Sequence, residues 1–378
     1  MLSNKTYPIR SHDEFRGAQQ LPTPALVIDA KTVRRNIGRL ADYVASHKLG
    51  VRPHTKTHKS LRLATMQVEA GAIGLTAAKV GEAEVMAEVC NDLLLAYPPV
   101  NAIRAERLAV LAHDRAVRAA IDSIDALEVT AAAARTADVT TGLLVDLDVG
   151  FGRTGVQSPQ QALALAQAID STAGVQLDGI MFYPGHVWEP ADEQAPVLQA
   201  IDAILEETID LWTRNGLGAK IVSGGSTPTA YQSHHVTHQT EIRPGTYVYN
   251  DMNTVHGGYC SLDDCAARIV ATVVSNAVKG QVVIDAGSKT LTSDQCFPAP
   301  ESGHGYVVEL PDARIAKLSE EHGQIDVTRC DHVPAVGDRL TIVPNHICPC
   351  INLQDQAWWL EPDEPPQPLP IEARGKLQ

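Results

Sequence analysis

The ten residues VRPHTKTHKS, positions 51–60, carry five basic side chains. Pro53 interrupts regular structure, so we expect Lys56 just beyond the carboxyl end of a strand, where barrel enzymes keep their active sites. A lysine amine becomes nucleophilic near neutral pH when it is partly desolvated or lies near other cations. The side chains that supply such charge here are Arg52, His54, His58 and Lys59. The stretch therefore indicates covalent catalysis through Lys56, with a solvated basic loop as the alternative.

Two later stretches have the composition of phosphate-binding loops. SGGSTPTA (223–230) follows the strand-like run AKIV, and its glycines and hydroxyls offer backbone N–H groups and side-chain donors to an anion. IRPGTYVYND (242–251) brings Gly245 and Thr246 shortly afterwards. A glycine-serine turn without a ligand is the alternative for each loop alone. Two such loops in successive units favour one shared phosphate group.

Two further strand ends carry candidate residues. DLDVGFGRTGV (146–156) loosely matches a dinucleotide-binding glycine pattern, but Arg153 occupies an interior position and no acid is placed for a ribose, so we do not expect a dinucleotide site. In GIMFYPGHVWE (179–189), Tyr183 and His186 flank a Pro-Gly turn. Tyr183 either stacks on a planar cofactor or packs, and His186 is either a base or a loop residue.

The segment VPNHICPCINLQD (343–355) suggests a metal site. His346 and Cys348 are two residues apart, so in an extended strand they face the same side and can grip one divalent ion. Imidazole and thiolate suit Zn²⁺, whereas Mg²⁺ and Mn²⁺ prefer oxygen ligands. Water, substrate oxygens and Asp355 would complete a catalytic site. The alternative is an unliganded pair in a strand.

An alternation of strand-like and helical runs must position these residues. The strand-like runs cover 25–29, 50–54, 71–78, 92–98, 117–122, 142–150, 177–185, 219–225 and 245–251, with Ala-rich helical stretches between them. This order predicts a parallel sheet, closed as a (β/α)₈ barrel or open and doubly wound. From residue 265, where CAARIVATVV begins, the pattern changes to β-rich runs between Gly, Pro and Asp turns, which predicts an antiparallel β domain. The Pro-rich run EPDEPPQPLP is expected to be a surface strap.

Composition excludes several classes of partner. The 378 residues carry a formal net charge of −14 and no basic run that could neutralise phosphates, which argues against nucleic acid and anionic membranes. No run of about 18 apolar residues and no signal-peptide core is present, so we expect a cytoplasmic protein with a small-molecule substrate. Seven scattered cysteines, an odd number, indicate mostly reduced thiols.

Taken in order, these segments resemble the fold-type III pyridoxal-phosphate enzymes, and among them the D-threonine aldolases, D-serine dehydratases and 3-hydroxyaspartate lyases. LPTPALVIDAKTVRRNI is similar to the opening strand and helix of the family, and RPHTKTHKS resembles its P-H-x-K-x-H-K motif. The resemblance implies an alanine racemase-like fold. It consists of a pyridoxal-phosphate-binding (β/α)₈ TIM-type barrel over 22–255 and a β-rich domain, formed by 1–21 and 256–378, that carries the metal ligands.

The resemblance also implies roles for single residues. Lys56 would form the Schiff base with pyridoxal 5′-phosphate. NHIC resembles the metal-binding H-x-C of D-serine dehydratases, whereas several aldolases carry H-x-D there. The other implied cofactor contacts are Arg153 near the phenolic oxygen, Tyr183 against the ring, Arg243 at the pyridine nitrogen, and Ser226, Thr227, Gly245 and Thr246 at the phosphate.

The function implied is a metal-dependent lyase that cleaves D-β-hydroxy amino acids into glycine and an aldehyde. A metal on His346 and Cys348, with Zn²⁺ ahead of Mn²⁺ or Mg²⁺, would bind the β-hydroxyl, and His186 would act as base or water orienter. The alternative is a D-serine or 3-hydroxy-D-aspartate dehydratase, in which Lys56 removes the Cα proton. A racemase is disfavoured because we identify no tyrosine base, and a non-catalytic cofactor carrier because it needs no metal pair. By resemblance we expect a homodimer.

Overall fold

A computed structural model describes residues 17, 18 and 20–378. Residues 1–16 and 19 lie outside the described residues. The predicted contribution of 1–21 to the β-rich domain and the N-terminal segment expected to lack a signal peptide fall mostly on these residues. The chain divides into two compact units. The barrel unit comprises Gly38–Lys56, Leu61–Gly245 and Gly375–Gln378, and the β-rich unit comprises the described residues up to Ile37, Thr57–Ser60 and Thr246–Arg374. The chain therefore crosses between the two units several times. The prediction had only two crossings, near residues 22 and 255.

Eight parallel strands form the sheet of the barrel unit. They are β2 (Gly50–Val51), β3 (Leu75–Ala77), β4 (Asp92–Leu95), β5 (Ala116–Ile121), β6 (Thr141–Leu147), β7 (Val175–Phe182), β8 (Ile221–Gly224) and β9 (Glu241–Ile242). Their order is β2-β9-β8-β7-β6-β5-β4-β3, and a parallel bridge between His54 and Thr76 links the two ends. This topology confirms the predicted TIM-type barrel rather than a doubly wound sheet.

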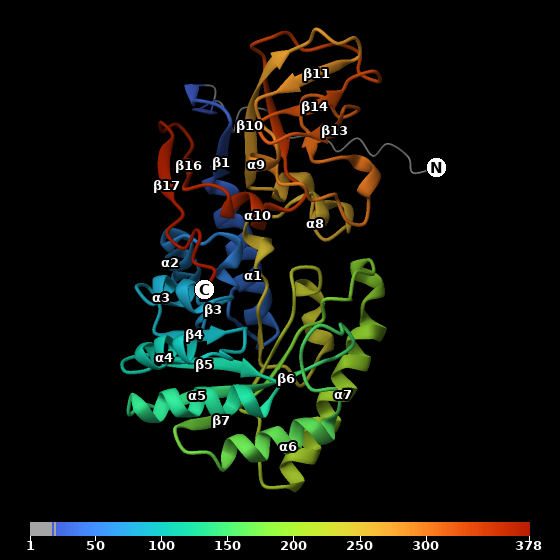
Figure 1. Ribbon diagram of the computed structural model, residues 1–378. Helices are drawn as coiled ribbons and strands as arrows, with labels where there is room; N and C mark the ends of the chain where they lie inside the picture. The colour runs from blue at the N-terminus through green and yellow to red at the C-terminus, as the bar shows by residue number, and fades with distance from the viewer. Residues whose placement is uncertain (1–16, 19) are drawn as a thin grey trace. The chain divides into compact units, whose positions relative to one another are not determined.

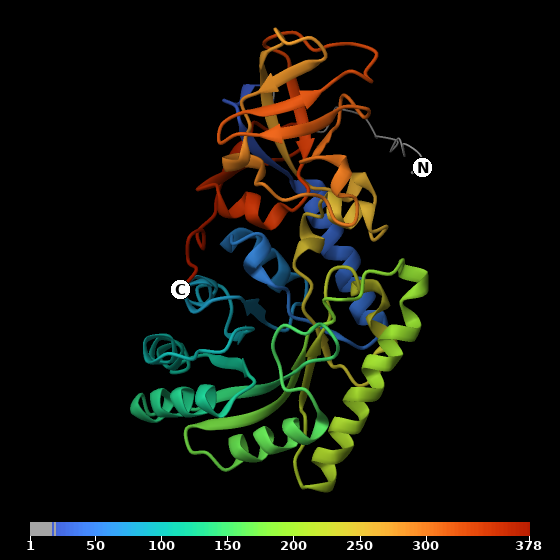
Figure 2. The same cartoon turned by 45° about the vertical axis from the view of Figure 1, so that its right-hand side comes forward.

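Helices follow the strands on the outside of this sheet. They are α2 (Leu61–Glu69), α3 (Val80–Met86), α4 (Ala102–Leu111), α5 (Ile124–Thr136), α6 (Pro159–Asp170) and α7 (Ala195–Arg214). Figure 1 shows α4, α5 and α6 along the sheet, and Figure 2 shows α7 beside α6. The side chains of Asn101, Ser123 and Ser158 cap α4, α5 and α6 by accepting a backbone N–H of the first turn. These caps fix where three of the loops on the carboxyl edge of the sheet end.

The predicted strand over 245–251 is wrong. Thr246–Val248 form a short 3-10 helix, and the last barrel strand is β9, which precedes it. The Asn250 N–H donates to the Thr246 carbonyl over 2.7 Å, and Asn250 has a φ of 53°. Tyr247, Val248 and Tyr249 are buried, so the run is apolar because it belongs to the core. A short apolar run can be buried in a helical turn as well as in a strand, and the sequence pattern does not separate the two.

The β-rich unit contains a nine-stranded mixed sheet. Its strands are β1 (Ala25–Asp29), β10 (Ala267–Ser275), β11 (Gln281–Ile284), β12 (Tyr306–Val307), β13 (Arg314–Leu318), β14 (Gly323–Asp326), β15 (Arg339–Val343), β16 (Gln356–Leu360) and β17 (Gln367–Pro370). Its helices include α8 (Met252–His256), α9 (Ser288–Leu291) and α10 (Ile347–Asn352), and α1 (Ala30–Ser46) follows β1. The strands pair antiparallel except β1 with β16, which pair in parallel.

One expectation about this sheet needs correction, and one is refined. The run 25–29, assigned to the parallel sheet of the barrel, is β1 and pairs with β10 and β16. Within the Pro-rich strap, Gln367–Pro370 forms the edge strand β17 against β16. Proline is tolerated there because an edge strand does not need every N–H for pairing.

All seven cysteines are free thiols, in agreement with the prediction. Among the described residues, no helix is both long enough and apolar enough to cross a membrane.

Candidate active site

Lys56 occupies the short 3-10 helix Thr55–Thr57, four residues after β2 ends. Its side chain is exposed, whereas those of Thr55 and Thr57 are buried. Thr55 Oγ1 lies 2.5 Å from Glu82 Oε1 and 3.0 Å from the Thr76 carbonyl oxygen. Lys56 itself makes no hydrogen bond or ion pair to another described residue. The hydrogen bonds of Thr55 hold this turn in place, and the Lys56 amine is exposed.

Two of the four cations near Lys56 in the sequence, Arg52 and Lys59, have structural partners. The buried Arg52 guanidinium donates to Glu241 Oε1 over 2.8 Å and also pairs with the Asp92 carboxylate. The buried Lys59 Nζ lies 3.4 Å from the Ala373 carbonyl oxygen. A buried charge is stable only when it is paired, and these partners are far away in the sequence.

The loop after β6 forms a pocket around Arg153 and Tyr183. Asp148 Oδ1 accepts the backbone N–H groups of residues 150, 151 and 152 over 3.0–3.1 Å, which shapes the turn. The Arg153 guanidinium carbon lies 4.7 Å from the centre of the Tyr183 ring and 5.2 Å from that of Phe151. Two residues proposed separately as cofactor contacts therefore lie together. The pocket is lined by Asp146, Leu147, Asp148, Phe151, Arg153, Thr154 and Tyr183.

Asp146 in this pocket was missed by the sequence analysis. It lies in β6, is 6% exposed, and its Oδ2 accepts the Thr154 hydroxyl over 2.8 Å. Burial raises the pKa of Asp146 to about 6, against the opposing effects of the Thr154 hydrogen bond and the Arg243 charge. The available signal was an acid inside the otherwise apolar run GLLVDL.

Arg243 and His186 are two further polar residues of the barrel unit. Arg243 is buried and donates to Ser223 Oγ over 2.7 Å and to the Phe182 carbonyl over 2.8 Å. Burial lowers its pKa to about 10. The buried His186 Nδ1 has no hydrogen-bond partner, and a Cβ at Gly150 would approach the imidazole to 3.2 Å. Buried polar nitrogens are normally hydrogen-bonded, so this nitrogen is open to a bound polar group.

The predicted phosphate loops leave neighbouring strands at the same edge of the sheet. Ser223 and Gly224 of β8 pair in parallel with Glu241 and Ile242 of β9, and Gly225 follows with a φ of 81°. The Ser226 N–H donates to Thr229 Oγ1 over 3.1 Å, and its hydroxyl lies at the same distance. Thr229 was not singled out in the sequence, and it holds Ser226 in place.

The remaining predicted phosphate contacts differ in exposure and in unit. Thr227 is half-buried and Gly245 is buried, both in the barrel unit. Thr246 is half-buried and belongs to the β-rich unit.

The predicted metal pair lies at the start of a helix, not in an extended strand. His346 precedes α10 in an extended conformation, and Cys348 is in its first turn. Burial lowers the pKa of His346, but the hydrogen bond with Cys348 and the charges of Cys348, Asp251 and Asp294 together raise it to about 9. The two side chains therefore meet, although by a different geometry from the one predicted.

Segments from elsewhere in the β-rich unit surround this pair. His346 Nδ1 lies 3.2 Å from Asp294 Oδ2, and Cys348 Sγ lies 3.2 Å from Thr57 Oγ1 and 3.7 Å from Thr246 Oγ1. Asp294 lies 52 positions from His346 in the sequence, which explains why pattern alone did not find it.

Asp355, predicted as a further ligand, pairs instead with Arg374 at 2.6 Å and is 85% exposed. Within the part of the chain that the structure describes, no three His, Cys, Asp or Glu side chains form a complete metal site. His346 and Cys348 stay a predicted metal pair.

Comparisons with known proteins identify the family. Residues 28–253 match the family Alanine racemase, N-terminal domain, and residues 266–359 match the serine dehydratase domain family. The chain is 29% identical over 369 residues to a 3-hydroxy-D-aspartate aldolase of Paracoccus denitrificans (strain Pd 1222), which covers 94% of this chain and 93% of that protein.

Two solved structures are similar over almost their full lengths. A D-threonine aldolase from Filomicrobium marinum has a TM-score of 0.87 and 28% identity, covering 95% of this chain and 98% of that one. A D-threo-3-hydroxyaspartate dehydratase, solved as a mutant in the metal-free form, has a TM-score of 0.86 and 26% identity, covering 93% and 98%. A D-threo-3-hydroxyaspartate dehydratase of Delftia sp. (strain HT23) is 30% identical over 352 residues, covering 87% of this chain and 91% of that protein. Because the alanine racemase domain match spans more than half of the chain and this relative covers most of it, the chain belongs to the fold-type III pyridoxal-phosphate enzymes of the D-threonine aldolase and D-serine dehydratase family, and it is a lyase.

Proposed function

We propose that this lyase cleaves D-β-hydroxy amino acids by an aldol reaction that yields glycine and an aldehyde. The observation that carries the proposal is the 3.2 Å contact between Thr57 Oγ1 and Cys348 Sγ within the β-rich unit. Thr57 directly follows Lys56 in the chain, so the lysine motif continues into the surroundings of the metal pair. A lysine for the cofactor and a metal pair for a hydroxyl together match a substrate that carries an amine and a β-hydroxyl.

Residues of the barrel unit fit pyridoxal phosphate. The cofactor, when bound, supplies an electron-withdrawing ring that stabilises negative charge at Cα. Lys56 presents the amine for its attachment, and Tyr183 with Arg153 offers a ring face and a cation. The loops after β8 and β9 offer N–H groups and hydroxyls to its phosphate. The partnerless Nδ1 of His186 supports a role in taking or orienting a proton at the substrate.

His346 and Cys348 fit a divalent metal. Histidine ligands commonly hold one ring nitrogen against a carboxylate, and the contact of Nδ1 with Asp294 leaves Nε2 for a metal. A divalent ion there supplies a Lewis acid that lowers the pKa of the β-hydroxyl. The soft thiolate favours Zn²⁺ over Mn²⁺ and Mg²⁺. The metal-free form of a related dehydratase supports a metal in this family.

A dehydratase is the second candidate. The same pair would then assist departure of the β-hydroxyl, with Lys56 removing the Cα proton and a keto acid and ammonia as products. The His-x-Cys pair and the likeness to a D-threo-3-hydroxyaspartate dehydratase favour it. The likeness to a D-threonine aldolase and a 3-hydroxy-D-aspartate aldolase favours the first candidate.

Product analysis separates the two. The protein is incubated with pyridoxal phosphate, Zn²⁺ or Mn²⁺, and D-threonine, D-phenylserine, D-serine or D-3-hydroxyaspartate, and the products are identified by mass spectrometry. Glycine with an aldehyde supports the aldolase, a keto acid with ammonia supports the dehydratase, and the absence of both with every substrate contradicts the proposal. His346→Ala should abolish turnover and retain the cofactor; unchanged activity would remove His346 from the metal site. The homodimer stays a prediction for sedimentation analysis.

A further inference from the structure

The loop that carries Arg153 closes back onto β6. The Val156 N–H donates to the Asp146 carbonyl over 2.9 Å, and the Asp148 N–H donates to the Val156 carbonyl over 3.1 Å. Leu147 and Val156 form a parallel bridge at the same place. The two ends of the loop are therefore tied together, and the stretch between them needs its own support.

Two carboxyls hold the stretch that directly follows Arg153. The Thr154 hydroxyl donates to Asp146 Oδ2 over 2.8 Å. The Gly155 N–H donates to Asp122 Oδ2 over 3.0 Å. Gly155 has a φ of 106°, and a Cβ there would lie 2.6 Å from a backbone nitrogen of the same loop, so only glycine fits. We call Asp122 and Asp146 the loop clamp.

The loop clamp belongs to two neighbouring strands of the barrel sheet. Ile121 of β5 pairs with Val145 of β6, so the next residues along, Asp122 and Asp146, lie side by side at the carboxyl edge. Burial raises the pKa of Asp146 most, and the charge of Asp122 raises it further. Adjacent carboxyls that repel each other are unfavourable for the fold alone, so this placement indicates a role at the site.

The position of Arg153 depends on this support. Among the residues that the structure describes, the exposed Arg153 has no hydrogen-bond or ion-pair partner and contacts only the rings of Phe151 and Tyr183. Such contacts are weak at an exposed position, so the backbone held just after Arg153 decides where the guanidinium lies. Asp146 lines the same pocket as Arg153 and Tyr183.

We propose that Asp146, through Thr154, is a positioning residue that keeps the Arg153 guanidinium over Tyr183 and against the bound cofactor, with Asp122 as a second support. The proposal gives a task to a buried carboxyl that neither candidate reaction uses. It rests on the cofactor contact proposed for Arg153, and it applies equally to an aldolase and to a dehydratase. The competing explanation is that the loop clamp only stabilises the fold.

An absorption titration of the resting holoenzyme tests the proposal. The protonated link between Lys56 and the cofactor is positively charged, so a guanidinium held beside the cofactor disfavours that form and lowers the pKa of the link. Thr154→Val keeps the side-chain shape but removes the hydroxyl that fixes the loop. It should raise the pKa of the link by about 0.5 to 1, because Arg153 moves away. Thr154→Ser keeps the hydroxyl and should restore the wild-type pKa.

Two variant backgrounds show whether this effect runs through Arg153 and Asp146. Arg153→Gln removes the cation and should raise the pKa of the link at least as much as Thr154→Val does. In that background Thr154→Val should add no further rise. In an Asp146→Ala background Thr154→Val should again add none, because the hydrogen bond is already lost.

Three results would overturn the proposal. The first is a Thr154→Val variant that lowers the free energy of unfolding but leaves the pKa of the link unchanged, as a purely structural clamp predicts. The second is an equal rise from Thr154→Val with and without Arg153. The third is an Arg153→Gln holoenzyme with the wild-type pKa, because Arg153 would then not act on the link at all.

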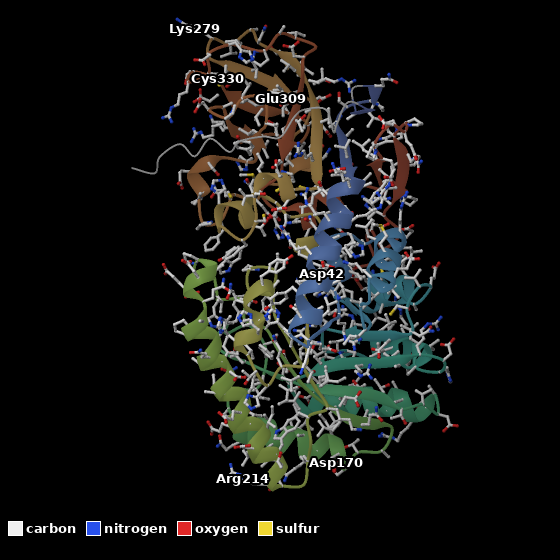
Figure 3. All side chains as sticks on the ribbon, turned by 180° about the vertical axis from the view of Figure 1, so that it is seen from behind. Asp42, Asp170, Arg214, Lys279, Glu309 and Cys330 are labelled. Carbon is white, nitrogen blue, oxygen red and sulfur yellow. The ribbon has the colours of Figure 1, made fainter. Side chains whose placement is uncertain are left out.

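Matched control variants remove the same groups elsewhere in the barrel unit. The Thr237 hydroxyl, just before β9, donates to Asp202 Oδ2 over 2.7 Å, so Thr237→Val breaks the same kind of bond. Asp170, labelled in Figure 3, is an exposed acid at the end of α6. Thr237→Val and Asp170→Asn should leave the pKa of the link unchanged. A rise as large as that of Thr154→Val in either control would also overturn the proposal.

The titration needs no turnover, so its result is independent of the proposed reaction. If no D-β-hydroxy amino acid is cleaved, the proposed function fails while the titration still decides the role of Asp146. If cleavage occurs but Thr154→Val leaves the pKa of the link unchanged, the proposed function stands and this inference fails.

Discussion

The barrel unit and the β-rich unit assemble their candidate residues in different ways. In the barrel unit the residues follow the carboxyl ends of parallel strands, so Lys56, Arg153 and Tyr183 each belong to a loop whose place is set by the strand order. In the β-rich unit the surroundings of His346 come from four separate segments, around residues 57, 246, 294 and 346–348. The residues of a site that follows a repeated topology can be predicted from the sequence. The residues of a site assembled by long-range packing can be predicted only in part.

Removal of Lys56 tests the barrel half of this comparison and should have the largest effect. Lys56→Ala should lower kcat/KM by on the order of 10³-fold or more, because it removes the amine that attaches the cofactor. The absorption spectrum of the purified holoenzyme should lose the band of lysine-bound cofactor. Lys220→Ala is the control, and near-normal turnover of the Lys56 variant would contradict the assignment.

The buried polar network of the barrel unit should matter for stability rather than for chemistry. Glu241 Oε1 lies 2.8 Å from Arg52 Nε and 2.6 Å from Ser223 Oγ, inside the sheet. Glu241→Ala leaves a buried guanidinium short of a partner and should lower the free energy of unfolding by about 3–5 kcal/mol in chemical denaturation. A change below about 1 kcal/mol would show that Asp92 alone suffices for Arg52.

Asp146 should make stability depend on pH. Its folded pKa of about 6 is above the ordinary value of 3.8, so the folded protein keeps a proton that the unfolded chain releases. The stability that Asp146 contributes is therefore fully present below about pH 3.8 and lost as the pH rises through about 6. Relative to the wild type, Asp146→Asn should gain up to about 3 kcal/mol between about pH 4 and pH 7, measured by denaturation at each pH. A pH-independent difference would contradict the raised pKa.

Asp294 tests the β-rich half and should have the smallest of these effects. Asp294→Asn removes the carboxylate that lies against His346 Nδ1 and should weaken metal binding by about 10- to 100-fold. Competition with a chelator measures this loss, while the amount of bound cofactor should not change. Asp355 was predicted from the sequence as a metal ligand but pairs with Arg374. Asp355→Asn should therefore leave the metal affinity unchanged.

Much of the candidate site could be predicted because its signals are local. The motif around Lys56 and the glycine loops after β6 and β8 are short runs, and their side chains need only a strand end to point toward the same edge. Asp146 and Thr229 were missed although they lie in the same runs, because an acid or a hydroxyl there shows its importance only through burial and contacts. The partners of Arg52 and Lys59, which are Glu241 and the Ala373 carbonyl, could not be predicted because they are distant in the sequence.

The sequence by itself determined the alternation of strands and helices, the helix starts at Asn101, Ser123 and Ser158, and the loops that carry the lysine and metal motifs. These features depend on hydrophobic period and on capping within a few residues. The tertiary structure alone decided that β1 joins the mixed sheet, that Thr57 and Thr246 lie against Cys348, and that Asp122 and Asp146 hold the loop that carries Arg153. Such contacts join segments that periodicity treats as independent, so only the packing of the whole chain brings them together.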